Sequence, residues 1–192
     1  SETIGNVVAA HGTGDVAVSF QGIRLQKKNF VAHIDHMNSF SEIAHKSGKE
    51  AGSQIMKFEV QDASPTIATE LNLVPGEQVY YIKRLRFIKD NAAQLEETWM
   101  SVARFPDLTV SHMQKSKFSY IENECGIKII GTYETFSPTF PTPEIASILR
   151  ISPRDPILKI QTQAVDSNSI PLDYSLLYSN IIEFQVKYFF PR

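Results

Sequence analysis

The sequence contains a single cysteine, Cys125, which excludes an internal disulfide and fits a reducing compartment. No apolar run approaches the roughly 18 residues that span a bilayer, and no signal-peptide pattern opens the chain. An excess of charge is missing as well: 19 basic residues stand against 21 acidic ones, which is too balanced for a nucleic-acid surface spread over the chain. We therefore expect a cytoplasmic globular protein that does not contact membranes.

Motifs of common enzyme classes are also missing. The chain has no Gly-x-Ser-x-Gly elbow and no Walker loop. Cys125 is expected on the buried side of a helix, which favours a structural cysteine over a nucleophile. His33 and His36 have the spacing of a metal-binding pair, but a third ligand at a typical spacing is lacking. On these grounds we expect no catalytic residue, metal ion or cofactor.

A glycine-rich stretch near the start, HGTGDVA at residues 11–17, satisfies the pattern Gly-x-Gly-x-x-Ala. A dinucleotide-binding loop requires that such glycines lead into a helix, because the helix N-terminus holds the pyrophosphate. Residues 15–20 instead alternate as a strand does, and no acidic ribose partner follows at the expected distance. We therefore predict two strands joined by a glycine-rich turn. His11, within this turn, is interpreted as an exposed side chain.

The chain contains an internal repeat at an offset of 78 residues. Residues 64–100 align without a gap with residues 142–178, so that Pro65 falls on Pro143 and Ile82 on Ile160. Each copy predicts a short helix that begins with a capping Ser or Thr followed by Pro, and ends before a second Pro. A hairpin follows, with strands at 79–88 and 94–100 in the first copy, and at 157–165 and 172–178 in the second.

Further elements are expected around the two copies. Strands are predicted at 53–60 and 127–133 and near the C-terminus, and a short capped helix begins at Ser39. Ser116 is expected to cap a helix that Gly126 ends. Because two helix-plus-hairpin units can pair into one antiparallel sheet with helices packed on it, we predict an α+β fold.

The first predicted strand of the repeat differs from its copy in charge. Its alternation places Arg84 and Arg86 on one face, whereas the second copy has Thr162 and Ala164 there. The fold therefore does not need arginine at these positions, and two guanidinium groups on one face can clamp a dianion. A solvated strand face is the alternative. Glu96 on the returning strand is either a surface charge or a hydroxyl acceptor, and the sequence does not give the register.

Several sequence stretches together resemble one known family. They are NSFSE, ATELNLVPGEQVYYIKRLR, LEETWM followed by FPDL, SKFSYIENECGIKI, ILRISPRDPILKI and PLDYSLLY. From about Asn38 onward the chain resembles the UTRA effector-sensing domain of the HutC subfamily of GntR-type bacterial transcription regulators. The resemblance implies a chorismate-lyase-like fold for residues 30–192, with residues 1–29 as the end of a winged helix-turn-helix wing and a linker. The DNA-reading helices are then missing from this chain.

The resemblance also implies the ligand and its contacts. Family members form homodimers and bind small metabolites, frequently phosphorylated sugars or amino sugars, and Arg84 and Arg86 match the arginines that hold the ligand's phosphate or carboxylate. The other positions that match ligand contacts are a serine at a helix start, a glutamate that accepts from sugar hydroxyls, a tyrosine near the pocket and a closing loop: Ser116, Glu96, Tyr178, and Ser39, Phe40 and Ser41. After Tyr178 the chain departs from the family pattern, so the sugar end of the pocket is expected to differ.

The function expected from this resemblance is ligand sensing. The bound anion shifts the dimer between states that bind and do not bind operator DNA through the missing N-terminal domain. A chorismate-lyase-like enzyme acting on a small carboxylate and a domain used only for dimerisation are the alternatives. For the sensor we expect Arg84→Ala to abolish stabilisation by a phosphorylated ligand and to leave the unliganded fold nearly unchanged.

Overall fold

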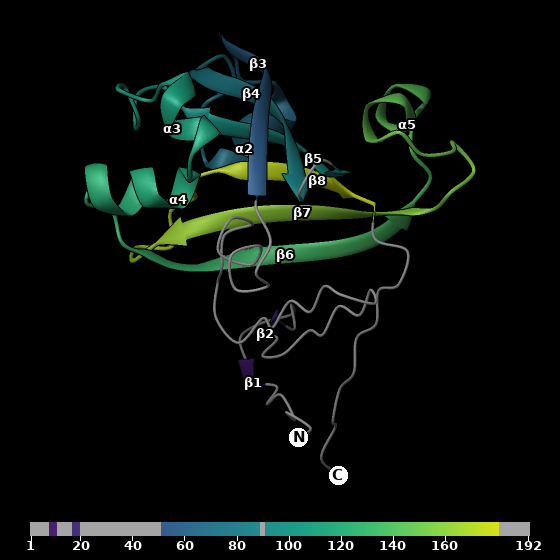
Figure 1. Ribbon diagram of the computed structural model, residues 1–192. Coiled ribbons are helices and arrows are strands. Elements are labelled where there is room, and N and C mark those ends of the chain that lie inside the picture. The colour runs from purple at the N-terminus through teal and green to yellow at the C-terminus, as the bar shows by residue number, and fades with distance from the viewer. Residues whose placement is uncertain (1–7, 11–16, 20–50, 89–90, 181–192) are drawn as a thin grey trace. The chain divides into compact units, whose positions relative to one another are not determined.

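The computed structural model describes residues 8–10, 17–19, 51–88 and 91–180 (Figure 1). The chain divides into two compact units, Ser39–Asn180 and Ser1–Asn38 with Ile181–Arg192. In the second of these, β1 (Val8–Ala10) pairs antiparallel with β2 (Ala17–Ser19). A strand and not a helix therefore follows the glycines, which confirms the predicted hairpin. Several positions singled out in the sequence lie outside the described residues: His11, His33, His36, Ser39, Phe40, Ser41 and the C-terminal strand.

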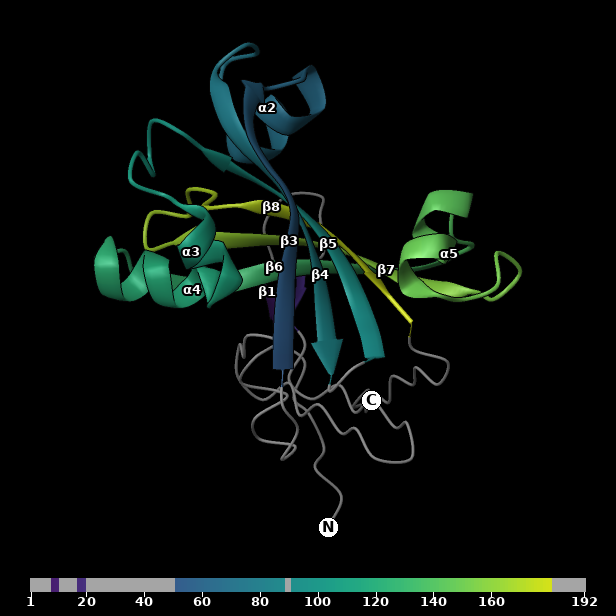
Figure 2. The same ribbon diagram turned by 45° about the horizontal axis from the view of Figure 1, so that its top comes forward.

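The unit Ser39–Asn180 is built on one antiparallel sheet of six strands (Figure 2). In spatial order the strands are β3 (Ala51–Asp62), β4 (Gln78–Ile88), β5 (Asn91–Ser101), β8 (Tyr174–Ser179), β7 (Ile157–Asp166) and β6 (Ile129–Thr139). The predicted α+β class is confirmed. Among the described residues, no helix has the length and apolarity needed to cross a membrane.

The two repeat helices have the same ends. In α2 (Pro65–Leu71) and α5 (Pro143–Leu149), proline opens the helix and the preceding Ser64 or Thr142 accepts a hydrogen bond from a backbone N–H three residues on. Each helix ends at a residue in the left-handed backbone conformation, with φ of 55°, after which the chain turns towards the next strand. The sequence signals for both helices are confirmed.

The remaining helices lie between β5 and β6 in the chain. They are α3 (Val110–Gln114), α4 (Lys117–Ser119) and a π-helical turn η1 (Tyr120–Glu124) that continues α4. As predicted, Ser116 caps α4 by accepting a hydrogen bond from the Ser119 N–H at 3.3 Å, and Gly126 follows η1 with a positive φ of 65°. The sequence did not indicate α3.

The two faces of the sheet carry different helices and separate apolar clusters. Alternate residues Val79, Leu85 and Leu95 belong to the clusters that α2 and α5 complete. The opposite face carries Tyr80 and Ile82, which pack in a third cluster with Met113 and Tyr120 and with other residues of the 105–129 segment. The strands β4 and β5 therefore contribute apolar side chains to clusters on both faces of the sheet.

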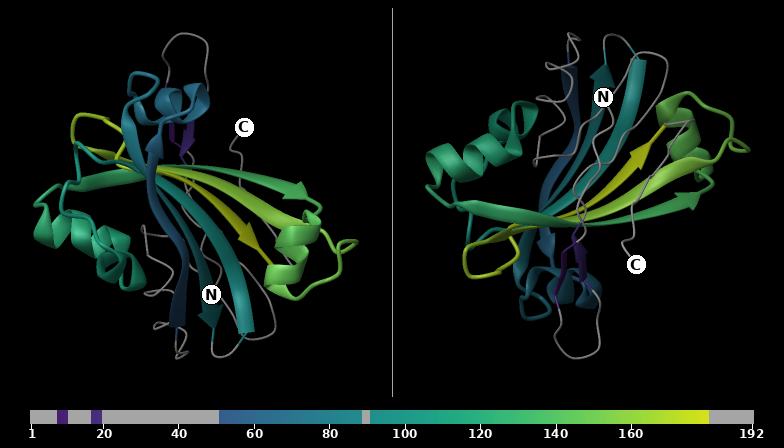
Figure 3. Two further views of the ribbon diagram at one scale, coloured as in Figure 1. Left: turned by 90° about the horizontal axis from the view of Figure 1, so that it is seen from above. Right: turned by 90° about the horizontal axis from the view of Figure 1, so that it is seen from below.

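The sheet repeats itself across its centre, where β5 lies beside β8 (Figure 3). The offset of 78 residues holds for the helices and for β7, but not for the returning strand. Ile82 pairs with Thr98, whereas Ile160, its counterpart, pairs with Leu177, one residue further on. The gap-free alignment was thus one residue wrong in β8, and the structural counterpart of Glu96 is Ser175.

Candidate functional site

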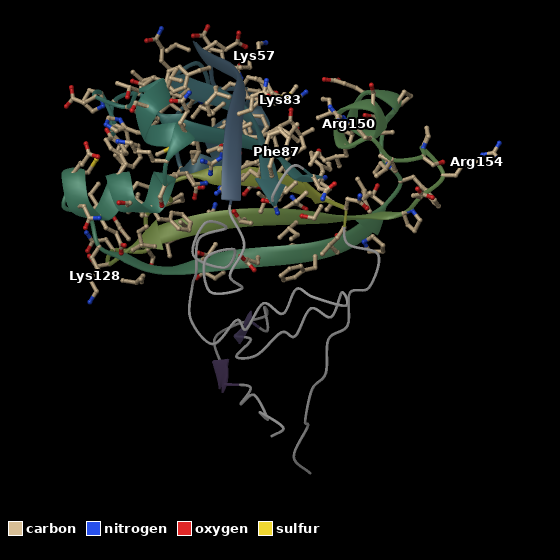
Figure 4. The ribbon with its side chains drawn as sticks, in the orientation of Figure 1. Lys57, Lys83, Phe87, Lys128, Arg150 and Arg154 are labelled. Atoms are coloured by element: carbon tan, nitrogen blue, oxygen red, sulfur yellow. The ribbon has the colours of Figure 1, made fainter. Side chains whose placement is uncertain are left out.

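Arg84, Arg86 and Glu96 lie together on the face of the sheet that α3 and α4 cover. Arg84 stands directly opposite Glu96 in the β4–β5 register, a placement that the sequence could not give. The exposed fraction is 2% for Arg84, 5% for Arg86 and 2% for Glu96. The alternative of a solvated strand face was therefore wrong. The odd-numbered neighbours Lys83 and Phe87 belong to the opposite face, where Lys83 pairs with Glu144 of α5 at 2.5 Å (Figure 4).

The contact between Arg84 and Glu96 is a two-point ion pair. Arg84 Nε donates to Glu96 Oε2 at 2.5 Å and Arg84 Nη2 donates to Oε1 at 3.0 Å. Arg84 Nη1 donates to the Met113 carbonyl at 2.7 Å, which joins β4 to the end of α3. Arg86 Nη1 lies 3.6 Å from Glu96 Oε2. Such paired N–H groups match the geometry of a carboxylate or phosphate.

A second ion pair extends this arrangement to α4 and β8. Lys117 Nζ donates to Asp173 Oδ2, to Ser175 Oγ at 3.0 Å, and to Glu96 Oε1 at 3.3 Å. The exposed fraction is 6% for Lys117 and 0% for Asp173. We call Arg84, Arg86, Glu96, Lys117 and Asp173 the buried charge cluster. Within the described residues it unites three cationic and two anionic side chains.

Hydroxyl groups complete the polar contacts of the cluster. Thr98 donates to Glu96 Oε1 at 2.9 Å and lies 2.8 Å from Ser175 Oγ. Ser175 donates to Asp173 Oδ2 at 2.9 Å, and the Ala164 N–H donates to Asp173 Oδ1 at 2.9 Å. Both carboxylates are therefore held by several donors, as buried charges require.

Burial and neighbouring charges shift the pKa values of Glu96 and Arg86. Burial by itself raises the pKa of Glu96, but the positive charges of Arg84, Lys117 and Arg86 outweigh it and hold that pKa well below its ordinary range. Burial, and then the charge of Arg84, lower the pKa of Arg86 to about 10 although Glu96 opposes this. Glu96 and Arg86 therefore both remain ionised at neutral pH.

Comparison with known proteins gives the family. Residues 46–184 match the UTRA domain. The chain belongs to the UTRA domain family. This confirms the resemblance seen in the sequence, and the relatives are GntR-family transcription regulators.

Similarity to individual relatives extends over most of the chain. The chain is 32% identical over 143 residues to the mannosyl-D-glycerate transport/metabolism system repressor MngR of Escherichia coli K12. This alignment covers 74% of the chain and 60% of the length of that repressor. The possible regulator YydK of Bacillus subtilis aligns with a TM-score of 0.72 at 22% identity, over 94% of this chain and 75% of that chain. The effector domain of PhnF from Mycobacterium smegmatis aligns with a TM-score of 0.71 at 23% identity, over 76% of this chain and 90% of that domain's chain. These two structures show the shared fold.

Tyr178 and Ser116 lie differently from the arginines in this UTRA domain. Tyr178 packs with Leu85 and Leu95 in the cluster under α5, so the sheet separates it from Arg84. It was expected near the ligand pocket, but the structure does not bring it to the buried charge cluster. Ser116 is half-buried and immediately precedes Lys117, whose side chain does reach the cluster.

Sequence reasoning missed Lys117 and Asp173, which are 56 residues apart in the chain. Each had a signal. Lys117 follows the predicted helix cap and so lies in the first turn of the helix, where the helix dipole disfavours a cation. Asp173 immediately precedes β8 and shares the parity of Ser175, as a side chain on the polar face would.

Metal binding gains no support from the arrangement. In the segments that the structure describes, no group of His, Cys, Asp and Glu side chains could hold a metal ion.

Cys125 is half-buried and packs against the cluster around Tyr80 and Ile82. Trp99 packs between Tyr81 and Tyr174.

Proposed function

We propose that this UTRA domain is the ligand-sensing part of a DNA-binding transcription regulator, and that its ligand is a small anionic metabolite. Phosphorylated sugars, phosphorylated amino sugars and sugar carboxylates are the anionic compounds that we favour. One observation carries the proposal: Arg84 and Arg86 are buried on the inner face of a duplicated sheet, while the other copy has Thr162 and Ala164 there. The second copy forms the same helix-and-hairpin unit without arginine there, so the repeated architecture alone does not account for these two charges.

The chemistry of the cluster supports an anionic ligand. Guanidinium groups bind carboxylate and phosphate through paired charged hydrogen bonds, and these bonds are strong where water is excluded. Ser116 adds a hydroxyl beside α4, and Ser39, Phe40 and Ser41 remain the proposed closing loop. MngR is named for mannosyl-D-glycerate, which joins a sugar to a carboxylate. The related chain thus points to the same class of compound.

In the mechanism that we propose, the ligand biases a homodimer of the HutC type between two arrangements. The attached DNA-reading domains then match or miss their two operator half-sites, which requires that the ligand bind the two states with different affinity. Allosteric coupling of this kind typically amounts to about 1–3 kcal/mol. Residues 1–29 form the end of the DNA-binding wing and the linker in this proposal, and residues 30–192 the sensor.

A thermal-shift screen of phosphorylated sugars, amino sugars and small carboxylates tests the proposal. A ligand at about 100 times its dissociation constant stabilises the folded state by about 2.7 kcal/mol. Arg86→Gln should remove this shift, whereas Arg154→Gln removes an equal charge from an exposed turn after α5 and should preserve it (Figure 4). A library without any hit, or a shift retained in Arg86→Gln, would contradict the proposal.

We further propose that the domain has no catalytic activity. The competing function, a chorismate-lyase-like enzyme acting on a small carboxylate, makes a separate prediction. Incubation of the chain with chorismate should yield no product beyond the uncatalysed background, and product formation that depends on Arg84 would favour the enzyme.

A further inference from the structure

The carboxylate of Glu96 already occupies the arginine groups that an anionic ligand would use. Its Oε2 accepts from Arg84 Nε at 2.5 Å and lies 3.6 Å from Arg86 Nη1. Its Oε1 accepts from Arg84 Nη2 at 3.0 Å, so that one whole edge of this guanidinium is engaged. An external carboxylate or phosphate that takes the same edge must compete with Glu96.

Glu96 also has a second set of donors on its other side. Oε1 accepts from Thr98 at 2.9 Å and from Lys117 Nζ at 3.3 Å. Lys117 is anchored independently by Asp173 and Ser175, and this anchoring does not involve the arginines. A carboxylate that leaves Arg84 therefore keeps a cation and a hydroxyl as partners, and escapes the large cost of an unpaired buried charge.

We propose that Glu96 is an internal competitor for the anion site: an incoming phosphate or carboxylate displaces it from Arg84 and Arg86, and Lys117 with Thr98 retains it. The inference rests on the proposed function and specifies how the site responds to its ligand. It assigns Lys117 the role of a positioning residue for Glu96. It also replaces the expected role of Glu96 as a simple hydroxyl acceptor with an exchange of ion pairs.

The exchange gives the ligand a physical connection to the helices over the sheet. Arg84 Nη1 binds the carbonyl of Met113 at the end of α3, and Lys117 lies at the start of α4. Both ends of the short segment 113–117 therefore contact groups whose partners change when the anion binds. Such a difference in contacts between two states is what a ligand needs in order to shift an equilibrium.

Titration calorimetry with inorganic phosphate tests the competition, because phosphate has the anionic chemistry without the sugar. Glu96→Gln removes the competing charge and keeps the side-chain shape, so we expect phosphate to bind at least about tenfold more tightly. Glu97→Gln is the matched control. It changes the net charge equally, but Glu97 lies on the opposite face and accepts from Tyr81 OH at 2.5 Å. Its phosphate affinity should stay within about twofold of the parent value.

The role of Lys117 needs a variant that leaves the charge of the cluster unchanged. Lys117→Met combined with Asp173→Asn removes one positive and one negative charge, and the asparagine carbonyl can still accept from the Ala164 N–H. With no cation to retain Glu96, phosphate should bind about tenfold more weakly. If Lys117 and Asp173 only stabilise the fold, phosphate affinity should not change. This variant also decides the question if Glu96→Gln does not fold.

The outcomes separate the two proposals. The inference is overturned if the parent chain binds phosphate and Glu96→Gln binds it no more tightly than Glu97→Gln. It is equally overturned if the double variant binds phosphate as the parent does. Absence of phosphate binding in the parent and every folded variant, together with no hit in the metabolite screen, would overturn the proposed function itself.

Discussion

Replacement of Arg84 by methionine should destabilise the unliganded domain strongly. The substitution removes the two-point partner of the Glu96 carboxylate and the donor to the Met113 carbonyl, both buried. Breaking a buried ion pair from one side typically costs about 3–5 kcal/mol. Because Lys117 and Arg86 remain close to Glu96, we expect the lower end, about 3 kcal/mol. This expectation differs from the one drawn from the sequence, that losing Arg84 would leave the fold nearly unchanged, because the sequence did not show these buried partners.

Urea unfolding followed by the fluorescence of Trp99, the single tryptophan, measures this effect. Trp99 is a suitable reporter because it packs against Tyr81 and Tyr174 within the sheet. For a chain of this size, about 3 kcal/mol corresponds to a fall of roughly 6–12 °C in Tm. Arg154→Met, at an exposed position, should change stability by less than about 0.5 kcal/mol. A loss below about 1 kcal/mol in Arg84→Met would refute the view that this guanidinium holds the cluster together.

Three more perturbations follow from the same contacts. The depressed pKa of Glu96 means that its ionised form stabilises the fold above its ordinary pKa of 4.5, and that this stability is lost as pH falls through the lower folded value. The Tm measured between about pH 6 and pH 3 should therefore fall less steeply in Glu96→Gln than in the parent chain. Parallel curves for the two proteins would contradict this. Lys117→Met alone leaves the carboxylate of Asp173 buried without its cation, so urea unfolding should show a larger loss than for Lys117→Met with Asp173→Asn. Ser64→Ala removes the cap of α2 and should cost about 1 kcal/mol in the same assay, whereas an unchanged midpoint would show that the cap is dispensable.

The fold could be predicted from the sequence to a large extent because its signals are local. A capping hydroxyl, a proline in the first turn and alternating apolar residues each act within a few positions, and the repeat presents them twice. The limit of this approach lies in the returning strand. One additional residue in the second copy shifts its register, and an offset read from identities in the helix cannot reveal it.

The candidate site was predictable only in part. Parity placed Arg84 and Arg86 on one face, and comparison of the copies singled them out because the second copy has Thr162 and Ala164 there. The opposition of Arg84 and Glu96 depends on register, and the approach of Lys117 depends on tertiary packing. A matching position in a family motif also does not say which face of a strand it occupies, and Tyr178 lies on the face opposite Arg84.

The two copies contribute different chemistry to one cluster, and this explains why a duplicated fold can hold an asymmetric site. The first copy supplies the arginines of β4 and Glu96 of β5; the second supplies Ser175 and the adjoining Asp173 beside β5. Lys117, from the connection between the copies, joins the two sets through its contacts to Glu96 and Asp173. The central pairing of β5 with β8 therefore does more than close the sheet. It brings the arginines and Glu96 of one copy beside Ser175 and Asp173 of the other, and both Lys117 and the Thr98–Ser175 contact link the two sets.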